Sequence, residues 1–191
     1  MTGSVAPDPA AAEGARILVA GVGNIFLGDD GFGVEVAGRL GSCSFPAEVK
    51  VADFGIRGLH LAYELLDGYA ALVLVDAVSR GDAPGTVSII EHLPDEDGEG
   101  VLAAMDAHGM NPAAVLAMVT DMGGSVGRVL VVGCEVAGVE DGIGLSPAVA
   151  EAVPHAVAAV RDVVGSLTDA SADHGGMYRE IPQNEQQEAM S

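Results

Sequence analysis

Basic residues are scarce in this 191-residue chain. Eight Lys and Arg stand against 28 Asp and Glu, which gives a formal net charge of −20 at pH 7. A nucleic-acid-binding surface needs positive charge to neutralise phosphates, and an anionic membrane surface makes the same demand. The composition therefore argues against both as partners. The negative charge itself suits either solubility or attraction to a basic segment of a partner protein.

Cysteines and long apolar runs are also few. The two cysteines, Cys43 and Cys134, lack the paired spacing of a zinc or redox site, and Cys134 is expected in the core because it lies in an apolar run. No apolar run approaches the roughly 20 residues that span a bilayer. Residues 1–14 have neither the basic nor the apolar region of a signal peptide, so a cytoplasmic protein is expected.

Three zones follow from the composition along the chain. Residues 1–14 are expected to be a disordered lead, residues 15–167 a single α/β domain, and residues 168–191 a mobile polar tail. The tail is rich in Gln and Glu and has too few large apolar groups to offset the entropy of ordering it. The middle zone is long enough, and apolar enough, to bury a core.

Apolar runs alternate with segments of helical spacing throughout the middle zone. Strands are predicted at residues 16–22, 48–53, 70–76, 85–91 and 127–134, and helices at residues 31–40, 58–66, 111–120 and 146–164. Pro112 is expected in the first turn of its helix, and Ser146 is expected to be an N-cap. This order predicts a three-layer α/β/α fold, with a mostly parallel, five-stranded twisted sheet and helices on both faces. Ligands bind beyond the carboxyl ends of such strands, so residues after Val22, Val51 and Val75 should gather at one edge.

A glycine-rich segment, GVGNIFLGDDGFG, follows the first predicted strand at residues 21–33. A dinucleotide-binding fingerprint needs a third glycine where Phe26 stands, and a P-loop needs Lys-Ser or Lys-Thr where Asp29 and Asp30 stand. Two carboxylates repel phosphate, so nucleotide binding is disfavoured. Asp29 is expected to cap or support the start of a helix. Asp30 is a candidate ligand because the flanking glycines let another group approach closely.

The segment GVGNIFLGDDGFGVEV resembles the signature of the hydrogenase maturation endopeptidases, which runs roughly G-x-G-N-x-x-x-x-D-[DE]-G-x-G. The second acidic residue of that signature is a metal ligand in the family, and it falls on Asp30. The family's second ligand, an Asp at the end of an apolar strand, falls on Asp76 in LVLVDAV. The third ligand, a His that precedes a helix, falls on His108. The resemblance covers residues 16–164.

Each of these residues also has an ordinary structural interpretation. Asp76 could form a turn after its strand, although a charge after five apolar residues is costly unless it is paired or liganded. A single His usually just finds a hydrogen-bond partner. Two carboxylates and one imidazole suit Ni, Zn, Fe or Mn, and the chain has no H-E-x-x-H pair. The choice of nickel therefore comes from the resemblance alone.

A further segment, DFGIRGL, resembles the family's D-x-G-T-x-G box and begins at Asp53. Ile56 stands where the family has Thr, so the hydroxyl of that position is missing here. Asp53 is interpreted either as a carboxylate that orients the substrate or a ligand, or as an Asp that forms a turn.

The resemblance implies an endopeptidase that removes the C-terminal extension of the [NiFe]-hydrogenase large-subunit precursor after nickel insertion. The nickel would belong to the substrate, the enzyme would be a monomer, and Asp30, Asp76, His108 and Asp53 would form the catalytic site. The hypothesis for the chemistry is metal-assisted attack by water, because no Ser or Cys with a partner base is evident. Two other interpretations stay open: a nickel-binding hydrogenase-assembly chaperone without proteolytic activity, and a nucleotide-binding domain.

Overall fold

The computed structural model describes residues 16–92 and 111–175, with side chains as far as residue 170. Its strands form one sheet in the order β2-β1-β3-β5-β4. The strands are β1 (Ile17–Val22), β2 (Val49–Gly55), β3 (Ala71–Val78), β4 (Val87–His92) and β5 (Arg128–Glu135). Only the β4–β5 pair is antiparallel among these strands. The predicted five-stranded, mostly parallel sheet is confirmed.

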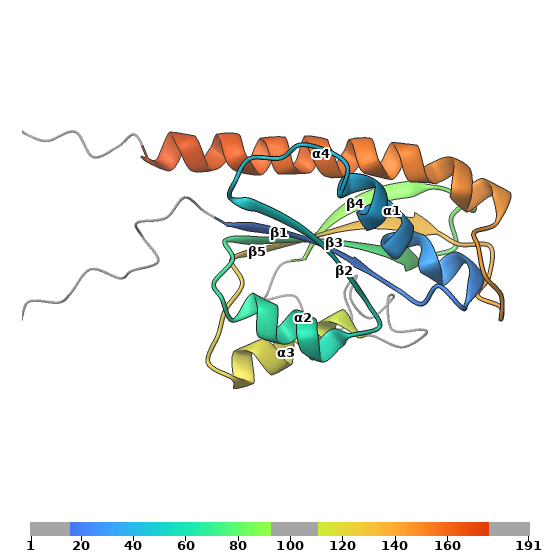
Figure 1. The fold of residues 1–191 in the computed structure, drawn as a ribbon, viewed down its shortest axis with the longest axis horizontal. Coiled ribbons are helices and arrows are strands. Elements are labelled where there is room, and N and C mark those ends of the chain that lie inside the picture. Colours follow the sequence, from blue (N-terminus) through green and yellow to red (C-terminus); the bar gives the residue numbers. More distant parts are fainter. Residues whose placement is uncertain (1–15, 93–110, 176–191) are drawn as a thin grey trace, which may run out of the picture.

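Helices cover both faces of this sheet (Figure 1). They are the short 3₁₀ helix η2 (Gly28–Gly31), α1 (Phe32–Leu40), α2 (Gly58–Leu65), α3 (Pro112–Asp121) and α4 (Pro147–Gly175). Helices α1 and α4 lie on one face, and α2 and α3 lie on the other. The three-layer α/β/α prediction is therefore confirmed. No helix in the described part of the chain is long and apolar enough to cross a membrane.

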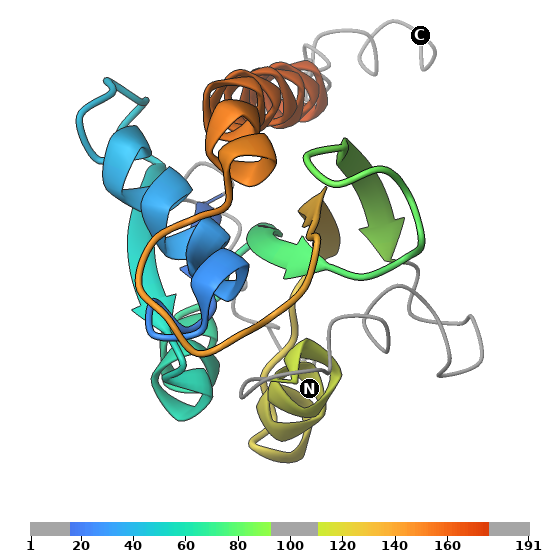
Figure 2. The same cartoon turned by 90° about the vertical axis from the view of Figure 1, so that its right-hand side faces the viewer.

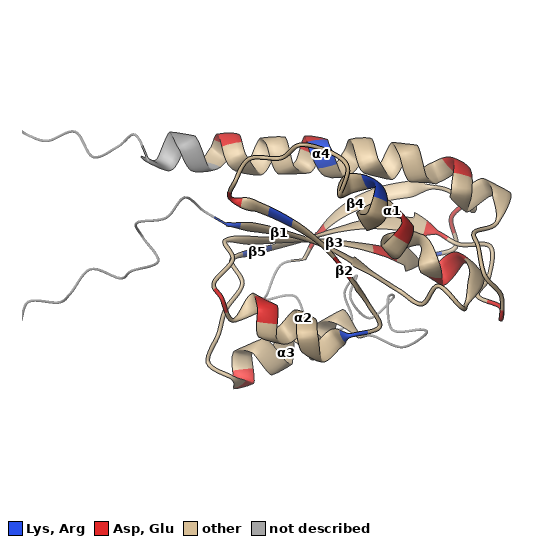
Figure 3. Ribbon diagram, in the orientation of Figure 1, with Lys and Arg blue, Asp and Glu red and all other residues tan. Residues whose placement is uncertain are grey.

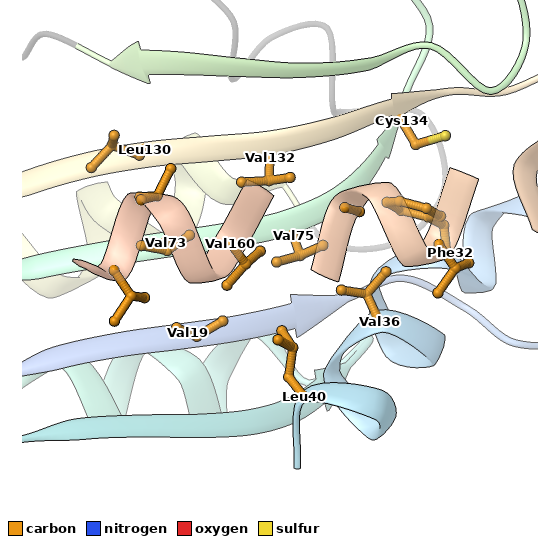
Figure 4. Close-up of a cluster of buried hydrophobic side chains, with 14 of the residues drawn as sticks. Val19, Phe32, Val36, Leu40, Val73, Val75, Leu130, Val132, Cys134 and Val160 are labelled. Atoms are coloured by element: carbon orange, nitrogen blue, oxygen red, sulfur yellow. The ribbon is translucent and has the colours of Figure 1, made fainter. Parts of the chain in front are cut away.

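Two apolar clusters lie on the two faces of the sheet because successive side chains along a strand point to opposite sides. Val73 and Val75 pack with Phe32 and Val160 on the α1–α4 face, as Figure 4 shows. Strands β1 and β3 are buried along their whole length. Full burial of one such side chain contributes about 1.5–3 kcal/mol, so these central strands anchor the site. Cys134 belongs to the same cluster, as expected.

Two glycines let α1 rest directly on the ends of the central strands. A Cβ on Gly33 would overlap the carbonyl oxygens of Val75 and Val22, and a Cβ on Gly21 would overlap the carbonyl oxygen of Gly33. No larger residue allows this approach of helix to sheet. The contact fixes η2, which carries the acidic pair, over the carboxyl ends of β1 and β3.

Two boundaries differ from the sequence prediction. Strand β3 continues to Val78 because its last residues pair with β5, so Asp76 lies within the strand instead of at its end. Helix α4 continues to Gly175, so the predicted start of the tail at residue 168 falls inside a helix. Leu167 is the last buried residue of α4 among the side chains that the structure describes, which end at residue 170. Extension of an existing helix adds one hydrogen bond for each residue fixed, which does not require further packing.

Candidate active site

Parallel pairing brings three candidate carboxylates to one end of the sheet. Gly21 of β1 pairs with Asp53 of β2 on one side and with Val75 of β3, the neighbour of Asp76, on the other. The segment after β1 carries Asp30. Figure 2 looks onto this end, where the ends of β1 and β3 lie near the start of α1. The sequence rule that placed these segments together is confirmed by this register.

Asp30 lies in η2 and is 9% exposed. Its Oδ2 accepts a hydrogen bond of 2.7 Å from the backbone N–H of Asn24. Gly23 makes the tight turn possible, because it has a φ of +125° and a Cβ there would overlap the carbonyl oxygen of Asp30. The glycine-rich segment therefore holds the Asp30 carboxylate with its own backbone.

Asp76 lies in β3 and is 5% exposed. Burial raises the pKa of its carboxyl well above the usual range, and the nearby charge of Asp30 raises it further. The backbone N–H of Ala77 donates to Asp76 Oδ1 at 2.8 Å, which opposes these two effects only in part. An ionised Asp76 is therefore costly in the free protein, and a proton or a metal cation relieves that cost. Two neighbouring carboxylates of this kind are suitable oxygen ligands for a divalent metal.

Asp29, which is also buried, supports a distant segment instead of capping its own helix. Its Oδ1 accepts a 2.6 Å hydrogen bond from the backbone N–H of Ser146, directly before α4. The predicted capping role of the Ser146 side chain is wrong, because its buried hydroxyl has no hydrogen-bond partner among the described residues. The carboxylate of Asp29 fixes this helix start in its place.

Glu135 is a buried carboxylate that sequence reasoning missed. It ends β5 and accepts backbone N–H bonds from Arg80 at 2.9 Å and from Gly81 at 2.9 Å, so it holds the segment after β3. The available signal was a charge at the end of an apolar run, as for Asp76. Burial, together with Asp29 and Glu135, raises the pKa of the adjacent Cys134 thiol to about 11.

The structure describes Asp53 but not His108. Asp53 is exposed near the end of β2, and its carboxylate has no hydrogen bond to any described residue. Arg57 donates instead to the backbone carbonyl of Asp53, at 2.6 Å. His108 lies outside the described residues. Within residues 16–92 and 111–175 no group of three or more His, Cys, Asp or Glu side chains is placed to hold a metal ion. The structure therefore brings together Asp30 and Asp76, with Asp53 on β2, which is separated from the strand of Asp76 by β1.

The sequence profile described as hydrogenase maturation protease matches residues 34–163, which is more than half of the chain. The chain belongs to the hydrogenase maturation protease family. It is 36% identical over 153 residues to the hydrogenase expression/formation protein HupD of Rhodobacter capsulatus, covering 78% of this chain and 71% of that protein. It is 32% identical over 136 residues to the hydrogenase 2 maturation protease of Escherichia coli K12, covering 70% of this chain and 81% of that one.

Solved structures of hydrogenase maturation proteases share this fold. The hydrogenase maturating endopeptidase HybD from E. coli superimposes with a TM-score of 0.66 at 29% identity, covering 79% of this chain and 93% of that one. The hydrogenase 2 maturation peptidase of Thaumarchaeota archaeon SCGC_AB-539-E09 gives a TM-score of 0.61 at 35% identity, covering 78% and 98%. The protein is thus a maturation endopeptidase, and membership of this protease family favours that interpretation over a chaperone without proteolytic activity.

Proposed function

We propose that this endopeptidase removes the C-terminal extension from the large-subunit precursor of a [NiFe] hydrogenase once nickel has been inserted. The observation that carries the proposal is the pair of buried carboxylates, Asp30 and Asp76, at the carboxyl end of the sheet in this protease fold. Structural carboxylates are rarely buried unless they are paired or bind metal. Their burial therefore supports recognition of a cation.

In this proposal the nickel belongs to the substrate. Asp30, Asp76 and His108 complete the coordination of the nickel ion that the precursor carries. The raised pKa of Asp76 supports this, because an arriving cation relieves the cost of its buried charge. Placement of the precursor's metal centre at Asp30 and Asp76 is therefore favourable only when nickel is present, so the carboxylate pair reports that loading is complete.

Hydrolysis then follows by attack of water on the scissile carbonyl. The substrate's metal polarises the carbonyl or activates the water, and cleavage of the C–N bond leaves a new carboxylate and a new amine. Asp53 is our candidate for the group that accepts the proton from water, because its carboxylate is exposed on the strand beside the site. Ile56 offers no hydroxyl at the position where the family has Thr. A covalent route through Cys134 is unsuitable, since its thiol is buried and has a raised pKa.

The same proposal places the chain in the cytoplasm as a monomer, with the large-subunit precursor as its partner and with no nucleic-acid or membrane partner. The net charge of −20 supports the exclusion of polyanionic partners. It also suits a precursor surface that carries basic residues.

The test compares nickel-loaded and nickel-free precursor as substrates, with cleavage followed by mass spectrometry. We expect cleavage of the loaded form only, and its loss in Asp30→Ala, Asp76→Ala and His108→Ala variants. Asp67→Ala is the matched control, because Asp67 is an exposed carboxylate at the opposite end of the sheet. Metal-dependent binding of the precursor without cleavage supports the chaperone instead. Undiminished cleavage by an Asp30 or Asp76 variant contradicts the site assignment.

A further inference from the structure

Large apolar side chains are exposed on three separate segments around the carboxylate pair. We call this set the apolar rim. It consists of Ile25 and Phe26 after β1, Ile56 and Leu59 at the start of α2, and Ile143 between β5 and α4. A single exposed apolar residue is ordinary on a protein surface. Exposed apolar side chains from three segments that meet at one site are not ordinary. Phe26 is 62% exposed and Ile143 is 82% exposed, so these side chains contribute little to the core.

Backbone hydrogen bonds hold these segments together. The carbonyl oxygen of Phe26 accepts from the N–H of Gly142 at 2.9 Å, and the N–H of Gly28 donates to the carbonyl oxygen of Gly142 at 2.9 Å. On the other side, the N–H of Gly23 donates to the carbonyl oxygen of Gly55 at 3.1 Å. Figure 2 shows the segment before α4 (orange) passing beside the segment before α1 (blue). The apolar rim is thus preformed, which lowers the entropy lost when a partner binds.

The apolar rim is continuous with the site itself. Asn24, whose N–H holds the Asp30 carboxylate, directly precedes Ile25 and Phe26. Ile25 also lies over Gly31, since a Cβ there would be 3.2 Å from the Cα of Ile25. A macromolecule that brings its metal and scissile bond to Asp30 must therefore cover these side chains.

Acidic side chains border the apolar rim. Glu140 and Asp141 precede Ile143 and are exposed, and exposed Asp53 lies near Ile56. Figure 3 shows acidic segments in red around the end of the sheet at which β1 and β3 finish. An apolar centre with a charged border is the usual anatomy of a protein–protein interface. A complementary partner surface is apolar at its centre and carries Lys or Arg around it.

We propose that the apolar rim is the docking surface for the folded part of the large-subunit precursor, next to its C-terminal extension. The proposal rests on the proposed function, because it names the surface by which that substrate is held. The partner contributes apolar side chains flanked by basic ones. The apolar rim sets affinity for the precursor, whereas the carboxylates carry out recognition of nickel and chemistry.

The experiment measures the Kd of nickel-loaded precursor and its cleavage rate at saturation, with the full chain and its Phe26→Ser and Ile143→Ser variants. We expect each substitution to raise Kd about tenfold, as for a central apolar interface residue, and to leave the saturated rate close to wild type. Phe26→Leu keeps the apolar contact and should bind nearly as wild type. Met122→Ser is the matched control, because Met122 is 42% exposed just after α3, away from the carboxylates. Equal thermal midpoints show that each variant is folded.

The outcomes separate the docking proposal from the proposed function. Wild-type Kd in both serine variants overturns the docking surface, even when cleavage proceeds normally. An equal loss of affinity in Met122→Ser overturns it too. The chain could instead form a concentration-dependent dimer that the same substitutions dissociate, while precursor affinity is unchanged. That result assigns the apolar rim to contact with a second copy and overturns the docking proposal. If loaded precursor binds in a way that depends on Phe26 but is never cleaved, the proposed function is contradicted and the docking surface is supported. If the wild-type chain does not bind the precursor, both proposals are overturned.

Discussion

The two ends of the central sheet treat carboxylates in opposite ways. At the amino end, Glu64 pairs with Lys50 at 2.6 Å and Glu91 pairs with Arg128 at 2.8 Å. At the carboxyl end, Asp76 and Glu135 are buried and accept hydrogen bonds from backbone N–H groups. Carboxylates therefore form ion pairs near the surface at the amino end and are buried at the carboxyl end.

The carboxyl groups at the two ends have pKa values shifted in opposite directions. The ion pairs and hydrogen bonds to Lys50 and Arg128 lower the pKa of Glu64 and Glu91 respectively, so their ionised forms are favoured by the fold. Burial does the reverse to Asp76 and raises its pKa. The fold thus disfavours a negative charge at Asp76, and a carboxyl group with so perturbed a pKa is typical of a functional position.

The largest expected effect is on cleavage. Asp30→Asn and Asp76→Asn each replace a carboxylate that we propose as a nickel ligand, so we expect the rate on nickel-loaded precursor to fall at least about 100-fold. Glu64→Gln, at the amino end, should leave the rate unchanged. The measurement is initial cleavage rate under subsaturating precursor. Equal losses in all three variants would show that the two ends do not differ in function.

A smaller effect is expected on stability at Glu135. Glu135→Gln keeps the shape but replaces one accepting oxygen with an amide that donates. The N–H of Arg80, which bonds both oxygens, then faces a donor, and the remaining bonds lose the charge that strengthens them. We expect a loss of about 1–3 kcal/mol in the free energy of unfolding, measured with urea. Glu91→Gln is the control and should cost less, because Glu91 is exposed. The reverse ranking would contradict the structural role of Glu135.

Asp76→Asn should stabilise the metal-free chain at pH 7 by roughly 1 kcal/mol, because it removes a carboxyl group whose ionised form the fold disfavours and keeps the hydrogen bond from Ala77. The pKa of Asp76 is higher in the folded chain than in the unfolded chain, so ionisation weakens the fold as pH rises through that interval. The stability difference between variant and wild type should therefore shrink as pH falls and Asp76 takes up a proton. A difference that stays constant from acid to neutral pH would refute this linkage.

The smallest effect is expected at Glu64. Glu64→Gln should cost at most about 1 kcal/mol at low salt, and less in 1 M NaCl, because the pair with Lys50 is partly exposed. The pH dependence has the opposite sign to that of Asp76. A lowered pKa means that the contribution is present at neutral pH and is lost as pH falls through the folded value. Thermal unfolding of the variant and wild type at two salt concentrations checks this.

The sequence predicted the strands well because β1 and β3 are continuous apolar runs, which only a sheet covered on both faces accommodates. It placed the end of β3 too early, since pairing with β5 carries that strand past Asp76. Pairing of this kind depends on a partner more than 50 residues away, so local pattern cannot show it.

In the candidate site, too, the sequence indicated some residues and missed another. Asp30 was predicted from its glycine-rich setting and the family signature, and Asp76 from the family resemblance, which the cost of a charge in an apolar run supported. Glu135 was missed because its partners, the N–H groups of Arg80 and Gly81, lie in a loop whose course the sequence does not define. Nickel itself was indicated only by the family resemblance, because carboxylates and imidazole serve several metals.

The hydrogen bond from Ser146 to Asp29 joins residues 117 positions apart. During synthesis, the segment that carries Asp30 and Phe26 leaves the ribosome long before the segment that holds it in place. The central strands can pair first, but the support beneath the acidic pair arrives only when α4 begins. The protease therefore gains its complete site late, after almost the whole α/β domain has been made.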